Sequence, residues 1–587
     1  MDGSGATIDT LARGVAAQRE GRAAEAEAGF RAAYAAAPEQ PMAAYLLGRL
    51  LLASHAQRPD RVEEATLLLR HALALRPDDL DTRRALAEAC LAAGWLGEAI
   101  DCYRAVLARR PDDTTAALRL AGALLQQGDA PAALATAEPV LRLAPALAEA
   151  WHVTGAALRA LGRHEPAQRH LQRAVQLDPS HARAWMSLGH VAADRNFPAA
   201  AEAYLREAVA CAPTLAAAHA SLGAALTEAG SLPQAIAACD QAIALAPADP
   251  VAHWHRATAH LLNGDFAAGW ADFEWRKQHP RFAADFPPLP GPAWDGTPLA
   301  GRSLLLRAEQ GLGDTIQFAR FLPGLAAQNG AAQGGRVILA CRPAALPALA
   351  PLLAQLPIEL AASDAAPAAD CHADLGSLPH LLAVRPATIP GATGYLRADP
   401  ARMAHWWPEA DGFARVGLVW AGNPAHRNDA RRSLPPSAVA AILAAAEAAP
   451  RLRFASLQKG PRAIEATTRY GLADHSAALT DFAATAAAIA RLDLVITVDS
   501  AVAHLAGAMA KPTWLLLPFA PDWRWLLNRS DTPWYTSLRL FRQTAPGDWS
   551  SVAARVAAAL IAGYRDSKQD LLFVNKKKQK NFSSMGV

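Results

Sequence analysis

The spacing of apolar positions changes about half-way along the chain. Up to about residue 280, apolar positions lie in helical stretches that recur every 34 residues. Prolines mark this step at Pro77, Pro111, Pro145, Pro179, Pro213 and Pro247. From about residue 303, short apolar runs alternate with Ala- and Leu-rich helical stretches. The pattern therefore predicts a helical repeat region followed by a mixed α/β region.

Each column of the repeat has a physical role in a pair of antiparallel helices. One column holds Gly94, Gly128, Gly162, Gly230 and Gly264, with Asn196 at the fourth of its six positions. These residues end the first helix in a left-handed conformation at low cost. Another column holds Ala99, Ala133, Ala167, Ala201 and Ala235, which lets the two helices approach closely. The prolines end the second helix, and stacked pairs are expected to form a superhelix over residues 1–279.

The repeat region is expected to hold about seven units from residue 40 to 280, with a diverged unit near residues 7–38. Five extra residues near His55–Asp60 are expected to lengthen one turn. Arrays of this kind present a concave groove, so a peptide or protein partner is expected there.

Seven apolar runs in the second region are predicted to be strands. They cover residues 303–307, 336–341, 415–421, 453–457, 493–498, 513–518 and 538–541. Alternation with helices predicts parallel sheets covered on both faces. We expect a linker or packed junction at 280–300, then two α/β lobes at 301–400 and 401–565. A cleft is expected at the carboxyl ends of their strands.

The first candidate loop follows the strand at 303–307. Gly311 and Gly313 let the backbone approach a ligand, and a helix is expected to start near Asp314. The third glycine of the dinucleotide fingerprint is missing, which disfavours nicotinamide binding. Asp314 is either a simple helix cap or a general base that takes a proton from an acceptor hydroxyl.

The second candidate loop follows the strand at 415–421. It contains Asn423 and the cations Arg427, Arg431 and Arg432, which suit a diphosphate whose charge grows as a donor bond breaks. The alternative is a solvated basic loop. Gln458 and Lys459 follow the next strand and add an amide and a cation at the same edge.

The third candidate loop follows the buried strand at 493–498. Asp499 and Ser500 are placed to meet ribose hydroxyls, and the amides of the next helix turn suit a phosphate. A lone histidine on such a helix is usually structural, but the position of His504 beside Asp499 favours a site role. No D-x-D motif occurs in these loops, so a metal is not required.

Composition adds three expectations. The formal net charge is +3, with 57 basic and 54 acidic residues, and residues 566–587 alone carry +3, so the body is neutral and nucleic-acid binding is disfavoured. Cys90, Cys102, Cys211, Cys239, Cys341 and Cys371 form no C-x-x-C pair and are expected to be reduced. Residues 1–22 lack a signal-type apolar core and no apolar run reaches about 18 residues, so a cytoplasmic chain without a membrane span is expected.

The motifs of the second region resemble a known enzyme family. They read EQGLGDTIQFARFLP (309–323), VGLVWAGNPAHRNDARRSLP (416–435), SLQKG (456–460), DLVITVDSAVAHLAGAMAKP (493–512) and DWRW with TPWY. With the repeats, they are similar to bacterial tetratricopeptide-repeat glycosyltransferases. The catalytic part resembles the heptosyltransferases and, more distantly, the O-linked N-acetylglucosamine transferases.

The resemblance implies an all-α tetratricopeptide solenoid followed by two Rossmann-type lobes of the GT-B kind. It implies that Asp314 is the base, that Asp499, Ser500 and His504 contact the donor, and that one of the three arginines does so too. Gln458 and Lys459 depart from the acidic donor-binding residue of the heptosyltransferases, which leaves the nucleotide and sugar open. The implied activity is inverting, metal-independent transfer from a nucleotide-diphosphate sugar, which is a substrate rather than a cofactor.

Two other functions stay open. One is a tetratricopeptide scaffold with a degenerate, inactive or merely sugar-nucleotide-binding transferase domain. The other is a sugar-nucleotide epimerase. Residues 566–587 are expected to be a disordered basic extension.

Overall fold

The computed structural model describes residues 3–54, 59–328, 335–391, 394–407, 412–426 and 428–564. These residues form two compact units. The first comprises Met1–Arg195 and Ala203–Pro213, and the second comprises Asn196–Glu202 and Thr214–Val587.

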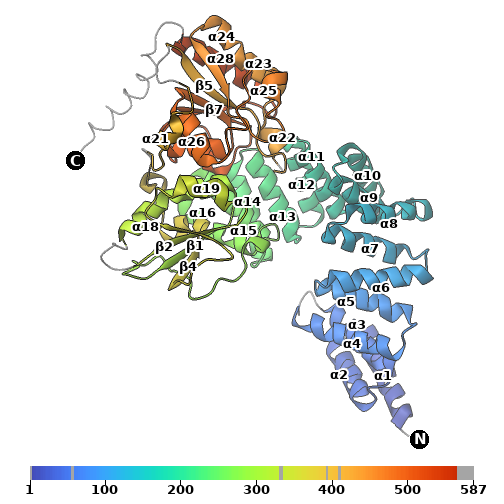
Figure 1. The fold of residues 1–587 in the computed structure, drawn as a ribbon. Coiled ribbons are helices and arrows are strands. Elements are labelled where there is room, and N and C mark those ends of the chain that lie inside the picture. Colours follow the sequence, from blue (N-terminus) through green and yellow to red (C-terminus); the bar gives the residue numbers. More distant parts are fainter. Residues whose placement is uncertain are drawn as a thin grey trace. The chain divides into compact units, whose positions relative to one another are not determined.

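The first unit is a series of antiparallel helix pairs (Figure 1). Its helices are α1 (Gly3–Arg19), α2 (Ala23–Ala36), α3 (Pro41–Ala53), α4 (Val62–Leu75), α5 (Leu80–Ala92), α6 (Leu96–Arg109), α7 (Thr114–Gln127), α8 (Ala130–Leu143), α9 (Ala148–Ala160), α10 (His164–Leu177) and α11 (Ala182–Asp194). Helix α12 (Pro198–Cys211) has residues in both units. Of the expected long turn, residues 55–58 lie outside the described residues, and Pro59–Arg61 is a short 3-10 helix.

The column residues behave as the sequence predicts. Gly94, Gly128, Gly162 and Asn196 all have positive φ, between 63° and 91°, at the ends of first helices. The alanine column is fully buried at Ala99, Ala133 and Ala167. Glycine and asparagine adopt this backbone conformation readily, which explains why the fourth position can hold asparagine.

The second unit begins with two further helix pairs. They are α13 (Ala216–Glu228) with α14 (Leu232–Leu245) and α15 (Pro250–Asn263) with α16 (Phe266–Phe273). The described residues thus contain eight pairs, which matches seven regular units and one diverged unit. Trp270 and Phe273 of the last pair share one buried core with Leu304 and Leu306 of the first sheet. Residues 280–300 also pack on this sheet, because Trp294 is buried and Ala293 pairs with His372.

The first sheet is parallel and has four strands. They are β1 (Leu304–Ala308), β2 (Val337–Cys341), β3 (Glu359–Ala362) and β4 (Cys371–Asp374), in the order β3-β2-β1-β4. Strands β3 and β4 are the two edges, and the sequence analysis missed both. Each has only four residues and no β-branched side chain, so neither produces a recognisable apolar run.

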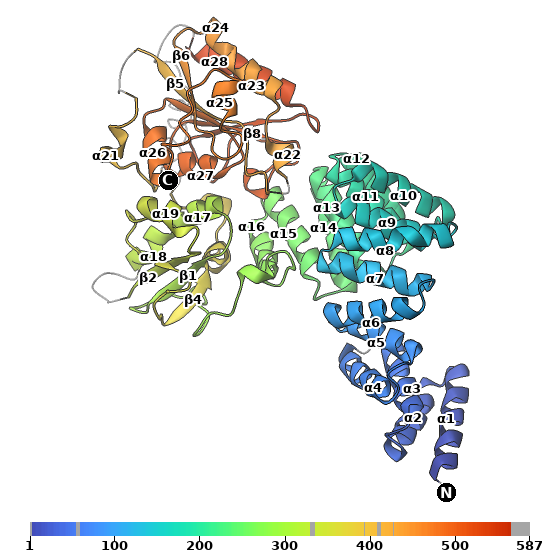
Figure 2. The ribbon, with the colours of Figure 1, turned by 45° about the vertical axis from the view of Figure 1, so that its right-hand side comes forward.

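The second sheet is parallel and has five strands. They are β5 (Ala414–Val419), β6 (Leu452–Ser456), β7 (Leu494–Val498), β8 (Thr513–Leu517) and β9 (Leu538–Arg542), in the order β6-β5-β7-β8-β9. One face packs on α23 (Pro436–Leu443) and α28 (Trp549–Tyr564). The other packs toward α26 (Phe482–Ala490) and α27 (Ala501–Ala508) (Figure 2). The predicted fold class, a tetratricopeptide solenoid followed by two parallel α/β lobes, is confirmed.

Each sheet has a point where its strand order reverses direction. In the first sheet, β1 lies between β2 and β4, so the loops after β1 and β4 diverge. In the second sheet, β5 lies between β6 and β7, so the loops after β5 and β7 diverge. Open α/β sheets bind ligands in the crevice that such diverging loops create.

The cysteines and the helix lengths bear on two of the expectations from composition. All six cysteines are free, and only Cys211 is not fully buried. Within the described ranges, no helix combines the length and apolar character that crossing a bilayer requires. The predicted basic extension at 566–587 lies outside the described residues.

Candidate functional site

The turn after β1 ends in the short helix α17 (Leu312–Phe318), which its own aspartate caps. The backbone N–H of Gly311 donates to Asp314 Oδ2 at 2.9 Å. The other carboxylate oxygen accepts a hydrogen bond from Arg524. The Asp314 side chain is still 25% exposed, so its carboxylate reaches solvent at the carboxyl end of the first sheet.

The turn after β7 leaves the start of α27 without a side-chain cap. Ser500 occupies the cap position, but its Oγ contacts Thr497 Oγ1 at 3.0 Å and does not bond the helix amides. The first amides of a helix have no partner within the helix, and they favour an anion. Burial and the Asp522 carboxylate raise the pKa of Asp499 to about 6, although Arg432 acts in the opposite direction.

The two turns lie directly against each other. A Cβ atom added at Gly313 would stand 3.0 Å from His504 Cδ2 and 3.4 Å from Ala501 Cα. Figure 2 shows α17 and α27 side by side, and the two helices are in contact. The structure therefore brings Asp314, His504 and the start of α27 together across the two sheets. A side chain at Gly313 would therefore require the His504 ring to shift by a few tenths of an ångström.

Arg524 connects the two turns, and the sequence analysis did not select it. It lies between two tryptophans in a 3-10 turn, η8 (Trp523–Trp525), and its side chain is 9% exposed. Its guanidinium donates to Asp314 and Gln317 of α17 and to Asp522 of its own loop. Burial opposes its charge, but the Asp522 and Asp314 carboxylates outweigh burial and raise its pKa. The D-W-R-W motif could have indicated Arg524, because a cation between two tryptophans is expected to be at least partly buried.

His504 is buried among aromatic side chains. Its Nδ1 lies 3.0 Å from the Tyr535 hydroxyl, and its ring stacks on Trp525 with centroids 5.4 Å apart. Burial, with the Arg524 and Arg320 cations nearby, lowers the pKa of His504 well below its ordinary value. The imidazole is therefore neutral at pH 7, so any site role for it is that of a hydrogen-bonding group and not of a cation.

The arginines after β5 point in different directions. Arg431 forms an ion pair with Glu228 of α13 at 3.2 Å. Arg432 lies against Gly422 and is close enough to Asp499 to lower its pKa. Asn423 is exposed, and its side-chain oxygen accepts from the Ala425 N–H. Arg427 lies outside the described residues.

Gln458 and Lys459 make contacts within their own lobe. The Gln458 amide oxygen accepts from the Trp420 and Ala421 N–H groups, and its amide nitrogen donates to the Ala421 and Lys459 carbonyls. All hydrogen-bonding positions of this buried amide are occupied, and its bonds to the backbone fix the conformation of the loop after β5. The exposed Lys459 donates through Nζ to the Ser476 carbonyl at 2.8 Å.

Comparison with known proteins identifies both parts of the chain. A tetratricopeptide repeat model matches residues 84–148 and 152–216. The model for glycosyltransferase family 9 (heptosyltransferase) matches residues 457–516, the segment that contains Asp499, Ser500 and His504. The chain carries tetratricopeptide repeats and a glycosyltransferase family 9 domain.

Protein FlbA of Caulobacter vibrioides is 31% identical over 341 residues, which are 52% of this chain and 54% of that protein. The chain thus spans about half the length of the curated relative it matches. Two solved structures are similar in part. A tetratricopeptide repeat protein from Parabacteroides merdae is 15% identical with a TM-score of 0.39, over 43% of this chain and 97% of that chain. The APC/C hetero-tetramer Cut9-Hcn1 is 17% identical with a TM-score of 0.35, over 46% of this chain and 52% of that chain.

A buried polar network around Glu309 and Arg276 stabilises the turn that contains Asp314. Glu309 accepts from the Arg276 guanidinium at 3.0 Å and from the Gly376 N–H at 3.1 Å. Arg276 also donates to Glu274 and to Ser377 Oγ. The network joins the end of the last repeat to the loops after β1 and β4. Burial raises the pKa of Glu309 although Arg276 opposes it, and breaking this buried pair is expected to be costly.

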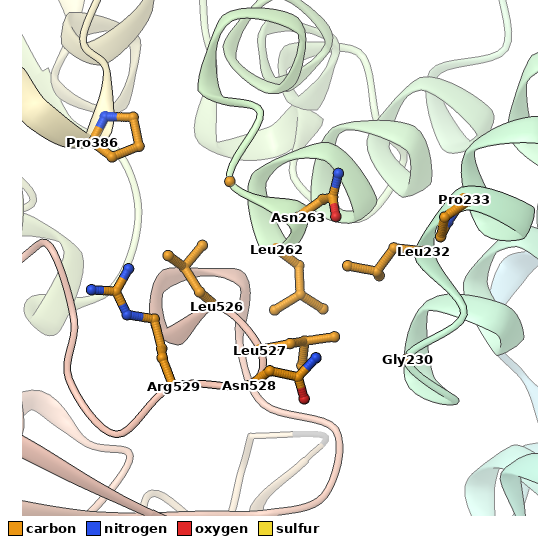
Figure 3. Close-up of a pocket in the computed structure, with 11 residues that line it drawn as sticks. Gly230, Leu232, Pro233, Leu262, Asn263, Pro386, Leu526, Leu527, Asn528 and Arg529 are labelled. Atoms are coloured by element: carbon orange, nitrogen blue, oxygen red, sulfur yellow. The ribbon is translucent and has the colours of Figure 1, made fainter.

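A cavity lies beside residues 526–529, which follow Arg524 in the chain (Figure 3). It has a volume of about 510 Å³. Turns of the repeats line one side through Leu232, Leu262 and Asn263, and residues 526–529 line the other. Leu526 has φ 53° and ψ −175°, a conformation that only glycine adopts easily. The surrounding packing therefore holds a strained residue two positions after Arg524.

Proposed function

We propose that the protein transfers a sugar from a nucleotide-diphosphate donor to an acceptor hydroxyl, with inversion and without a metal. One observation carries the proposal. The Asp314 turn and the uncapped start of α27 meet at the strand-order reversals of two parallel sheets. The family 9 match over residues 457–516 supports assigning the donor to the second lobe.

The donor diphosphate is assigned to the start of α27. It would accept hydrogen bonds from the uncapped helix amides and from Ser500, and Arg432 would approach it from the loop after β5. Asp499 stands at the same edge, where it is suited to bond a ribose hydroxyl of the nucleoside. Gly311 and Gly313 let the first lobe's backbone come close to the sugar, while Asn423, Gln458 and Lys459 hold the shape of the donor loops.

Asp314 is assigned as the base. In the free protein, Arg524 occupies one of its carboxylate oxygens. A bound diphosphate would offer Arg524 a stronger anionic partner and release that oxygen for the acceptor hydroxyl. The acceptor oxygen then forms a bond to the anomeric carbon as the carbon–oxygen bond to the diphosphate breaks. The proton passes to Asp314, and the nucleoside diphosphate leaves with the electron pair.

His504 is assigned a neutral role at the same point. Its ring lies between Gly313 and the Tyr535 hydroxyl, so it holds the two turns at a fixed separation and can donate one hydrogen bond. The repeats are assigned the recruitment of a protein acceptor or partner. The last repeat shares a buried core with the first sheet, so this one repeat is packed directly on the sheet that carries Asp314.

Two neighbouring arginines provide a matched test of the donor site. Arg432→Ala removes the cation beside Asp499, while Arg431→Ala removes one that pairs with Glu228. Isothermal titration with UDP, GDP, ADP and CDP identifies the nucleoside diphosphate that binds best. We expect Arg432→Ala to weaken that binding by at least about tenfold and Arg431→Ala to change it by less than about threefold.

The outcomes separate the candidate functions. Equal binding by both variants and the wild type contradicts the donor site. No binding of any nucleoside diphosphate favours the repeat scaffold with an inactive domain. Interconversion of a nucleotide sugar without release of nucleoside diphosphate favours the epimerase.

A further inference from the structure

Three potential metal ligands meet between two consecutive repeats of the first unit, far along the chain from the proposed transfer site. They are Glu149 and His152 of α9 and His181 at the start of α11. One ligand atom from each lies within 4.8 Å of the others. Glu149 Oε2 is 2.8 Å from His181 Nε2 and 3.5 Å from His152 Nδ1. Two ligands of a tetrahedral Zn²⁺ ion stand about 3.3 Å apart, so small side-chain shifts would suffice to bind one.

The repeat itself does not require these residues. One step of 34 residues before or after Glu149, the chain has Thr115 and Arg183. The column of His152 holds Leu118 and Met186. The column of His181 holds Leu147 and Leu215. The neighbouring repeats hold apolar side chains at both histidine positions, so the packing of the repeat does not explain why His152 and His181 meet beside Glu149.

The hydrogen bonding of His152 prepares it to bind an ion. Its Nε2 lies 3.3 Å from Ser187 Oγ, a suitable acceptor for the ring proton. Its Nδ1 is buried, and its nearest polar partner within the described residues is Glu149 Oε2 at 3.5 Å, too far for a good hydrogen bond. With the proton on Nε2, the Nδ1 lone pair faces a carboxylate oxygen, which is unfavourable unless a cation stands between them. Metal-bound histidines are usually oriented in this way by a second group.

We propose that Glu149, His152 and His181 bind a Zn²⁺ ion that ties the repeat of α9 to the repeat of α11. Two imidazoles and one carboxylate suit this ion and leave one position for water. Both histidine side chains are mostly buried, at 13% and 12% exposed, while Glu149 is 41% exposed and gives the ion access from solvent. Because each repeat contacts only its neighbours, an ion that joins two of them stiffens the array at that point.

Binding has one structural cost that the site must overcome. His181 Nδ1 now accepts the Ala184 N–H as the helix cap. Coordination through Nε2 moves the ring proton to Nδ1, which ends this cap. The site is therefore expected to be a moderate-affinity one that responds to the supply of zinc.

The test uses the untagged full chain, stripped with a chelator, and ZnCl₂ as the titrant. Calorimetry and metal analysis are expected to show one zinc per chain, and zinc is expected to raise the melting temperature. Glu149→Gln and His181→Asn should each weaken binding by at least about tenfold. Asparagine is a good helix cap, so His181→Asn retains that role and separates ligation from folding.

His164→Gln is the matched control, since it removes another histidine of the first unit outside the cluster. It is expected to bind zinc as the wild type does. Absence of zinc binding by the wild type overturns the proposal, as does equal binding by Glu149→Gln and His181→Asn. Equal loss in His164→Gln also overturns it, because binding would then be spread over surface histidines.

Discussion

The repeat array and the candidate site of the second unit differ in the sequence separation of the residues that stabilise each of them. In the array, the Arg159–Asp194 ion pair joins residues 35 positions apart, and both side chains are partly exposed. In the cleft, the Arg524–Asp314 pair joins residues 210 positions apart, and Arg524 is buried. The array is therefore a sum of similar neighbouring contacts, whereas the cleft depends on a few contacts between distant segments. The same type of substitution should therefore change the unfolding free energy by different amounts in the two regions.

The largest effect is expected at Arg524. Arg524→Met removes the buried cation that Gln317 and the partly exposed Asp314 and Asp522 carboxylates share. Removing one member of a buried ion pair typically costs about 3–5 kcal/mol of unfolding free energy. Urea unfolding, followed by tryptophan fluorescence near this loop, measures the change.

Arg159→Met is the matched change in the array. Its ion pair with Asp194 is partly exposed, so the expected loss is below about 1 kcal/mol. Similar losses of unfolding free energy for the two variants would show that sequence separation and burial do not distinguish the two regions.

The next effect is expected at Asp499, and it depends on pH. Burial and Asp522 raise the pKa of Asp499 to about 6, so between roughly pH 4 and pH 6 the folded chain binds more protons than the unfolded chain. The contribution of this group to stability therefore falls as pH rises through that interval. Asp499→Asn should raise the unfolding free energy by about 3 kcal/mol at pH 7.5 and change it little at pH 4. Unfolding curves at the two pH values check this, and an equal effect at both contradicts a raised pKa.

The smallest effect is expected at a glycine of the array. Gly128 ends α7 with φ 91°, and open space surrounds it, so only backbone strain opposes a side chain. Gly128→Ala should cost about 1 kcal/mol. Ala156→Gly, in the interior of α9, is a control with a comparable cost that arises from helix propensity instead. Circular dichroism melts measure both losses of stability, and calorimetric titration is expected to show that Gly128→Ala leaves nucleotide binding unchanged.

The same contrast explains what the sequence could predict. The helix pairs were predictable because each column repeats, so even Asn196 could be assigned its positive φ from its position. The seven longer strands were predictable from their apolar runs, while the four-residue edge strands β3 and β4 carry no such pattern. The local sequence pattern thus predicts the helices and the longer strands, whereas the short edge strands form because they pair with a neighbouring strand.

The candidate site was predictable only in part. The loops after β1, β5 and β7 could be located, because they follow strands and contain glycine and charge. Their partners could not, since Arg524 meets Asp314 and Tyr535 meets His504 only in the folded chain. The same reason explains why Arg431 resembled a site residue although it pairs with Glu228 of the repeats. A sequence shows that a cation is present but not which way it points.

The most direct test of the proposed transfer reaction is Asp314→Asn. The substrate is the nucleotide sugar whose nucleoside diphosphate binds best, and the rate is the release of nucleoside diphosphate with acceptor or water. The account predicts that turnover falls by at least about 100-fold, while the Kd for the nucleoside diphosphate changes by less than about threefold. Unchanged turnover with intact binding would contradict the assignment of Asp314 as the base.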